Sequence, residues 1–443
     1  MIQSDIHTIT YQNGEIQRVQ AVTADSWKEF SFFEPSDPKD AFDQVSELYR
    51  DYIIPRYGFL LGTIILFRIP EGFELPSQKV IGNTQFFTDE SYLSQRFRMH
   101  VHLHHRTLCF TDESTQKLFE ALNDAGCITV VSGKLPFLSV LPVGKTLGFL
   151  SKSPSSQLCV NVSFFTMTPL DITTPFDVIG TTIGMCVKDG ALFSPPLFSR
   201  EALLVAEEES VTIRSVPLSE ITVEIDGTVY QNGNNCVFYS RPDHTHTPRG
   251  GYDLVITGRT LTAFCTGGHT PIPSSGFVIH CSEKPRISGS PIIFHGFEHI
   301  HFGIQGGNSA VINGIKTDHF VSKFHDTRAF WSVSYPPTLY PIHFSKDRAP
   351  RILLGTDRDQ KPMILWLEGA GKYGYQPGKG SCGATLAESA DIAVQLGMTN
   401  AVHLDGGGSA EILLNGIKHL AVSDRDPETY AEKERAVSMA LKI

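Results

Sequence analysis

The distribution of apolar positions changes near residue 150. From about residue 151, short segments in which apolar and polar residues alternate follow one another closely, as in QLCVNVSFF (157–165) and YDLVITGRTLTAFCTGG (252–268). Alternation with a period of two is typical of β-strands with one buried face. Asp-Gly and Asn-Gly pairs separate several of these segments, as β-hairpins require. The pattern predicts a region rich in antiparallel strands.

One segment of this region has a helical pattern instead. In SCGATLAESADIAVQLGM (381–398), apolar positions recur at helical spacing on one side, and Gly397 lies where a helix would end. These positions are Leu386, Ala390, Ala393, Val394 and Leu396. The strands NAVHL, AEILL and IKHLAV follow, separated by a glycine-rich turn and an Asn-Gly turn. We therefore expect one helix followed by a meander near the C-terminus.

Residues 1–150 have a different pattern of apolar and polar positions, in which helical spacing is more frequent. Amphipathic helices are expected at 40–58 and 111–126, with a strand at 98–105, and a Gly-, Ser- and Lys-rich stretch at 143–157 indicates a boundary. We predict an α+β protein in which mixed and antiparallel β-sheets carry a few packed helices, with the site at strand-end loops. An N-terminal α/β extension of unknown role (1–150) would precede a core domain (151–443).

The composition excludes some classes of protein. The net charge of −10 argues against a nucleic-acid partner. The first residues lack a basic, apolar leader, so we expect a cytoplasmic protein. The longest apolar stretch, residues 57–67, is too short to span a bilayer and is expected to be a core strand or part of a homo-oligomer interface. The eight cysteines show no Cys-x-x-Cys spacing, which favours buried free thiols.

The most distinctive motif is LDGGGSA (404–410), in which Asp405 precedes three glycines and Ser409. Successive backbone N–H groups of Gly406, Gly407 and Gly408 can form an anion-binding concavity. A carboxylate beside such donors suits a substrate with both a leaving group and a negative charge. The competing interpretation is a glycine-rich hairpin turn.

Several motifs occur in an order that resembles the phosphodiester glycosidase family. These are NVSFF (161–165), RAPRILLG (348–355), GATLAE (383–388), LDGGGSA (404–410) and ERAV (434–437). The resemblance covers about residues 155–443. It implies hydrolysis of the bond between a sugar's anomeric carbon and a phosphodiester oxygen, with a carbohydrate or sugar-phosphate substrate.

The resemblance also implies candidate site residues. Glycosidases generally use two carboxylates, and the candidates for catalysis are Asp405, Glu388 and Glu368. The candidates for substrate binding are Asn161, Gln305, Gly306, Gly307, Arg348, Arg351, Gly406, Gly407, Gly408, Ser409 and Arg435. Glu388 could equally be a first-turn acid favoured by the helix dipole, Asn161 could cap a turn, and Arg435 could pair with Asp405 or another acid.

Two departures from the family pattern leave other substrates open. His403 stands where the family often has Asn, and Glu368-Gly369-Ala370 replaces a common Asp-Gly-Arg. The lost arginine would have been a bidentate phosphate or sugar partner. The alternatives are a glycosidase acting on a neutral oligo- or polysaccharide, and a non-catalytic carbohydrate-binding protein.

A metal site is a further open alternative. His100, His102 and His104 lie on one face of the strand expected at 98–105, a spacing that recurs in metal sites. Asp405 could also ligate a divalent cation. No cofactor is clearly implied by the sequence.

Overall fold

The computed structural model describes residues 1–35, 147–152, 156–167, 171, 173–174, 176–197, 200–233, 235–241, 244–286, 292–317, 347–369, 380–426 and 428–443, together with four short strands between residues 64 and 131. Those four strands form two antiparallel pairs, β4 (Ile64–Phe67) with β7 (Ile128–Val131) and β5 (Val101–His104) with β6 (Thr107–Phe110). The strand expected at 98–105 is therefore present. The helices expected at 40–58 and 111–126 lie outside the described residues.

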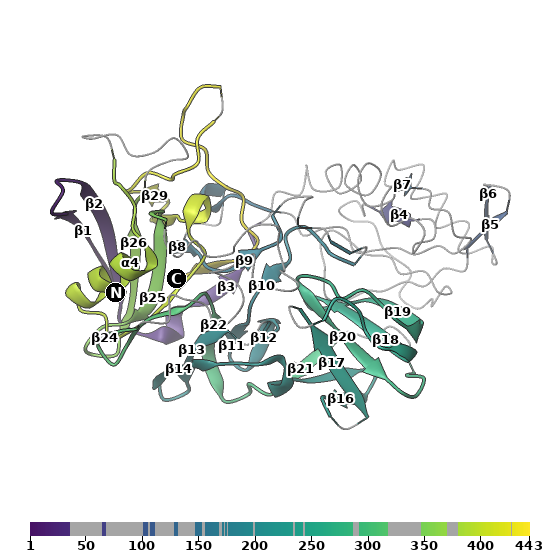
Figure 1. Ribbon diagram of the computed structural model, residues 1–443. Helices are drawn as coiled ribbons and strands as arrows, with labels where there is room; N and C mark the ends of the chain where they lie inside the picture. The colour runs from purple at the N-terminus through teal and green to yellow at the C-terminus, as the bar shows by residue number, and fades with distance from the viewer. Residues whose placement is uncertain are drawn as a thin grey trace.

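A seven-stranded sheet forms one side of the molecule (Figure 1). Its strands, in spatial order, are β1 (Ile2–Thr10), β2 (Ile16–Ala24), β26 (Pro362–Leu367), β25 (Arg351–Thr356), β27 (Asn400–His403), β23 (Ser309–Ile312) and β24 (Ile315–Lys316). Strands β25 and β26 are buried along their whole length because both faces of the sheet are covered. One face packs on the single described α-helix and the other on two further sheets.

The helix α4 (Leu386–Gln395) confirms the helical pattern read from the sequence. It begins with a capping box, in which the Thr385 hydroxyl accepts from the Glu388 N–H and the Glu388 carboxylate accepts from the Thr385 N–H. Ala390 and Ala393 are buried against the sheet. Gly397, just beyond the helix, has a φ of +96°, which suits glycine.

Two five-stranded sheets cover the opposite face of the large sheet. One contains β29 (Ile417–Lys418), β28 (Ile412–Leu414), β8 (Leu158–Asn161), β30 (Ala440–Lys442) and β3 (Ser31–Phe33). The other contains β12 (Ala191–Ser194), β11 (Cys186–Lys188), β22 (Ile300–Gln305), β13 (Glu201–Ala206) and β14 (Val211–Ser215). Trp27, Phe32 and Phe302 pack together where these sheets meet. This shared core joins the N-terminal strands to the later ones.

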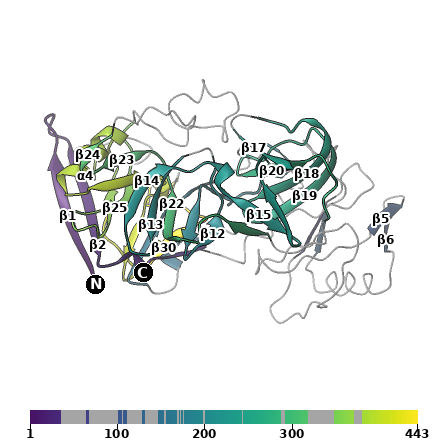
Figure 2. The same ribbon diagram turned by 90° about the horizontal axis from the view of Figure 1, so that it is seen from below.

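Smaller sheets complete the fold at the other end of the molecule (Figure 2). They are formed by β16 (Thr228–Gln231), β15 (Thr222–Ile225) and β21 (Ile293–His295), and by β17 (Cys236–Ser240), β20 (Gly276–Cys281), β18 (Arg249–Thr257) and β19 (Thr260–Gly268). A two-stranded pair, β9 (Phe164–Phe165) with β10 (Thr182–Ile183), adds to these. A second apolar core lies between them and the other face of the β11–β22–β13 sheet.

The α+β prediction is wrong. Within the described residues there is one α-helix, all pairings between named strands are antiparallel, and the rest of the regular structure is β-sheet with short 3-10 turns. The physical reason is that sheets cover one another, so apolar faces expected to pack on helices pack on strands instead. Residues 2–33 contribute β1, β2 and β3 to sheets of the later region, whereas the division at residue 150 stays a prediction.

We expect Arg18→Ala to destabilise the protein by about 3 kcal/mol, because it leaves the Glu368 carboxylate, which is 1% exposed, without its opposite charge. Arg18 lies on β2 and Glu368 follows β26, so the pair ties neighbouring strands together. Chemical unfolding of both proteins measures the difference. Arg214→Ala, which breaks an exposed pair with Glu220, is the control and should cost no more than about 1 kcal/mol. Equal effects of the two changes would contradict this account.

Candidate active site

The segment that carries Asp405 leaves β27 and forms one 3-10 turn, η7 (Gly407–Ser409). Gly407 has a φ of +59°, a left-handed conformation that is unfavourable for residues with a Cβ. A Cβ on Gly408 would lie 2.2 Å from both Arg435 Nη2 and Asp424 Oδ1. These two glycines therefore permit a tight turn and the direct approach of a charged pair to the backbone.

Part of the expected anion-binding concavity is already engaged by protein groups. The Gly407 N–H donates to the Pro350 carbonyl at 2.9 Å, and the Ser409 N–H donates to the Gly406 carbonyl at 3.2 Å. The Gly407 amide thus anchors the loop to the residue preceding β25. A binding role for the Gly406 and Gly408 amides stays a prediction.

Asn161, the last residue of β8, holds both ends of this loop. Its Nδ2 donates to the Asp405 carbonyl at 2.8 Å, and its Oδ1 accepts from the Glu411 N–H at 3.0 Å. The Asp405 N–H in turn donates to the Val162 carbonyl at 3.1 Å. Asn161 is 1% exposed, so its observed contacts position the loop rather than face an open pocket.

Asp405 is only partly exposed. Burial raises the pKa of its carboxyl from 3.8 to about 6, despite the opposing effect of the Ser409 hydroxyl. The charges of Arg435 and Arg200 also lower this pKa, as does the Gly406 amide, but burial has the larger effect. A carboxyl that titrates in this range can exchange a proton near neutral pH.

Two guanidinium groups lie near the Asp405 carboxyl. Arg435 makes a bidentate pair with Asp424, with Nε–Oδ2 at 2.8 Å and Nη2–Oδ1 at 3.0 Å. Arg200 is fully buried, its guanidinium lies 4.9 Å from the Phe164 ring centroid, and its Nη1 donates to the Gly306 carbonyl at 3.4 Å. The site therefore combines one carboxyl of raised pKa with positive charge.

Glu388 is an acid of the first turn of α4, which is the alternative that the sequence left open for it. Besides its part in the capping box, it accepts from Arg348 Nη2 at 2.7 Å and Nε at 3.2 Å. Burial alone would raise its pKa, but the bonds from Arg348 and Thr385 outweigh it and lower the pKa. Arg348 also pairs with Glu15 and lies 4.6 Å from the Tyr11 ring centroid. Both residues join α4 to the β1–β2 turn.

Glu368 is likewise occupied by protein groups. Arg18 donates to both carboxylate oxygens, and the Ser381 hydroxyl donates at 2.6 Å. The Ala421 N–H adds a further bond at 2.8 Å. In the described part of the chain, no hydrogen bond joins Asp405 to Glu388 or Glu368. Of the three candidate carboxylates, Asp405 has the fewest protein donors.

Most of the other side chains proposed to bind substrate make hydrogen bonds to the protein backbone. Arg351 donates to the carbonyls of Ala384 and Asp347, and burial lowers its pKa to about 10. The Gln305 side chain donates to the carbonyls of Arg200 and Val216. It also accepts from the N–H groups of Met185 and Leu197. The Gly307 N–H donates to the His403 carbonyl at 2.7 Å, beside Gly306.

His403, which stands where the family often has Asn, links three elements. Its Nδ1 is 3.0 Å from the Asn308 carbonyl and its Nε2 is 2.9 Å from the Ser389 hydroxyl. Since a carbonyl only accepts, Nδ1 carries the proton. Burial lowers the pKa of this imidazole to about 3. The neutral ring thus ties β27 to α4 and to the residue preceding β23.

Sequence reasoning missed Glu411, Asp424 and Arg200. Glu411 is 2% exposed, and burial raises the pKa of its carboxyl to about 7, with a further contribution from nearby Glu434. Lys418 Nζ lies 3.8 Å from its Oε1. A signal for Glu411 exists, since it is the one charged residue in the apolar segment AEILL. Arg200 and Asp424 have no comparable signal because they come from distant segments.

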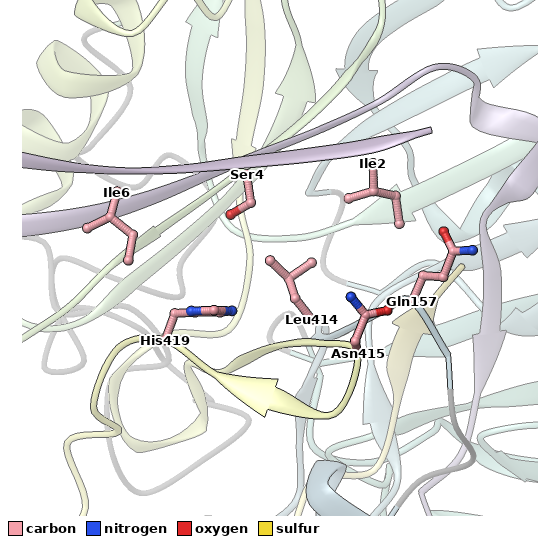
Figure 3. Close-up of a pocket in the computed structure, with 7 residues that line it drawn as sticks. All are labelled: Ile2, Ser4, Ile6, Gln157, Leu414, Asn415 and His419. Atoms are coloured by element: carbon pink, nitrogen blue, oxygen red, sulfur yellow. The ribbon is translucent and has the colours of Figure 1, made fainter.

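A cleft of about 360 Å³ lies between β1 and the β28–β29 hairpin. Figure 3 shows Ile2, Ser4 and Ile6 of β1 facing Leu414 and His419 across it. Gln157 and Asn415 complete the lining. None of the sequence-predicted site residues lines this cleft, so it is separate from the Asp405 loop.

The side chains of the three histidines proposed as metal ligands lie outside the described residues. His100 lies outside the described residues, and of His102 and His104 only the backbone of β5 is described. Over the described ranges, no group of three or more His, Cys, Asp or Glu residues has the arrangement of a metal site. In the same ranges, no helix is long and apolar enough to cross a membrane.

Comparisons with known proteins bear on this site. The family model described as phosphodiester glycosidase matches residues 219–443, slightly more than half of the chain. No match is found among curated protein sequences. Among solved structures, a hypothetical protein from Synechocystis is 14% identical with a TM-score of 0.43, and the match covers 100% of this chain and 61% of that one. The chain thus spans less than two thirds of that protein's length.

A second similar structure is the zebrafish N-acetylglucosamine-1-phosphodiester alpha-N-acetylglucosaminidase catalytic domain, auto-inhibited by its pro-peptide. It is 11% identical with a TM-score of 0.41, and the match covers 100% of this chain and 82% of that one.

We expect Glu411→Gln to stabilise the protein above pH 7 by up to about 3 kcal/mol, the equivalent of a pKa raised from 4.5 to about 7. Between these pH values the native state binds more protons than the unfolded state, so native stability falls as pH rises. Asp405 acts in the same direction between about pH 4 and pH 6. Unfolding free energies at pH 5 and pH 8 give the measurement.

The variant should show a flatter pH dependence than the native protein over this interval. Lys418 keeps its ion pairs with Glu432 and Glu434 in the variant, so its ammonium group still has opposite charges beside it. Glu207→Gln, at an exposed position, is the matched control and should change stability by no more than about 0.5 kcal/mol. A Glu411→Gln protein that lost stability at pH 8 would overturn this interpretation.

Proposed function

Because the chain belongs to the phosphodiester glycosidase family, we propose that it hydrolyses the bond between the anomeric carbon of a sugar and an oxygen of a phosphodiester. The observation that carries this proposal is the Asp405 carboxyl, whose pKa is raised to about 6 beside two guanidinium groups. The carboxyl supplies proton transfer, and the positive charge suits an anionic leaving group.

Asp405 acts as the general base. A departing phosphomonoester is already a weak base, with a second pKa of about 6, and so needs little protonation from the enzyme. The demanding step is the activation of water. In this step the water oxygen bonds to the anomeric carbon. The bond between the anomeric carbon and the phosphate oxygen breaks, and its electron pair remains on that oxygen. The water proton passes to Asp405, which later releases it to solvent.

Arg435 binds the phosphate. Its bidentate bonds to the Asp424 carboxylate match the geometry that guanidinium uses for phosphate oxygens. The side chains of both partners are about a third exposed or less, at 28% and 32%, so an incoming phosphate can reach the pair. The absence of a side chain on Gly408 keeps the guanidinium against the loop that carries Asp405.

We expect Asp405→Asn to lower kcat for a sugar-1-phosphodiester by at least about 100-fold, because general base catalysis contributes this much or more. Glu411→Gln is the matched control. This change also removes a carboxyl of raised pKa. Because Glu411 is only 2% exposed and cannot reach a substrate, the variant should retain turnover within a few-fold. Native kcat/KM should rise with pH through about 6 and then level off. Undiminished turnover by Asp405→Asn would refute the assignment.

We expect Arg435→Ala to raise KM for a sugar-1-phosphodiester by about tenfold or more, with a small effect on 4-nitrophenyl glycosides, which carry no phosphate. The assay compares 4-nitrophenyl glycosides, UDP-sugars and sugar-phosphate diesters, with and without chelator. Arg214→Ala, at an exposed ion pair, controls for lost charge. Turnover of the neutral glycosides alone would favour a glycosidase for neutral saccharides, and binding without any turnover a carbohydrate-binding protein.

A further inference from the structure

Two cysteines lie directly opposite each other at one end of the β17–β20–β18–β19 sheet. Cys236 is the first residue of β17, Cys281 is the last residue of β20, and the two are cross-strand partners. Both thiols are free, and the residues are 5% and 4% exposed. Each thiol shifts the pKa of the other.

We propose that Cys236 and Cys281 form a reversible disulfide when the protein meets a small-molecule disulfide oxidant such as oxidised glutathione. Directly opposite residues of an antiparallel pair have Cβ atoms about 4.5–5.5 Å apart. A disulfide needs about 3.5–4.5 Å. A small closing movement of the two strand ends is therefore sufficient.

The position of the pair gives the oxidant a route to buried sulfur. β17 is the edge strand of its sheet and is paired only with β20 there. Cys236 is the first residue of β17 and directly follows a turn. The next residue, Val237, is 42% exposed. Strand ends at a sheet edge open with little loss of contacts, so local fraying at the start of β17 exposes the pair.

The environment assigns the attacking group. The Cys236 thiol donates to the Gln231 carbonyl at 3.4 Å, and the interaction with Cys281 lowers the pKa of the Cys236 thiol. The same interaction raises the pKa of Cys281. Cys236 also begins the edge strand β17, next to exposed Val237, so its thiolate is the one that meets the oxidant first.

The chemistry balances with one oxidant molecule. The Cys236 thiolate attacks one sulfur of oxidised glutathione, which breaks the glutathione disulfide and releases one glutathione thiolate. The Cys281 thiol gives up its proton and attacks the Cys236 sulfur, releasing the second glutathione. Two protein thiols become a disulfide, and one glutathione disulfide becomes two thiols. An excess of reduced glutathione reverses both steps.

No other pair of the six described free cysteines is formed by cross-strand partners. Cys159 contacts the Ser156 hydroxyl and Cys186 that of Ser163, while Cys382 donates to the Gly383 carbonyl. Cys265, on β19 of the same sheet, is opposite Asp253. Cys265 is therefore a matched control within the same sheet.

The test uses the full chain, equilibrated with glutathione at ratios from fully reduced to fully oxidised, then quenched in acid, alkylated under denaturing conditions and digested. We expect a Cys236–Cys281 linked peptide in the native protein and in Cys265→Ser, and none in Cys236→Ser or Cys281→Ser. The link should vanish after reduction. It should also raise the thermal midpoint of the oxidised protein, since it restricts the unfolded chain between residues 236 and 281.

Recovery of both cysteines as alkylated thiols from the fully oxidised native protein would overturn the proposal. So would glutathione that remains attached to Cys236 without passing on to Cys281. These two outcomes are read from the native chain, so they hold even where a serine variant fails to fold. Neither outcome depends on turnover, and the proposal stands apart from the proposed hydrolase activity.

Discussion

The two hydrogen bonds of the Asn161 side chain determine where the Asp405 carboxyl lies. One bond fixes the Asp405 carbonyl and the other the Glu411 N–H, so the ends of the glycine loop are tied to the last residue of β8. β8 is itself held between β28 and β30, in a sheet covered by the large core. The three glycines have no side chains that could pack and hold the loop in place. The bonds from Asn161 at its two ends fix its position instead.

The same arrangement explains why Asp405 is different from the other acids. Glu388 is held by Arg348 and by the N-terminus of α4, and Glu368 by Arg18, Ser381 and Ala421. Hydrogen bonds and positive charge stabilise the ionised form of a carboxyl, whereas burial without enough donors stabilises the neutral form. The charges of Arg435 and Arg200 lower the pKa of Asp405, but burial has the larger effect.

Much of the strand-rich region could be predicted because its signals are local. The helix at 386–395, its capping residues and the turn at Gly397 follow from spacing and from single residues. The membership of β1 to β3 in later sheets has no such signal, because pairing across more than 300 residues depends on which edges remain open. Likewise, Arg200 and Asp424 reach the site only through the assembled sheets, so their roles could not be read from nearby residues.

The opposing titrations of buried groups connect the fold to the chemistry. His403 is held neutral, so the native state loses stability as pH falls below 6.5, where the unfolded chain binds the extra proton. Asp405 and Glu411 have raised pKa values, so the native state loses stability as pH rises toward 7. Both effects arise where β27 and β28 flank the glycine loop. A loop that is buried enough to raise the pKa of the Asp405 carboxyl also buries neighbouring groups. The stability lost at Asp405 as pH rises is the physical counterpart of its proton binding near pH 6.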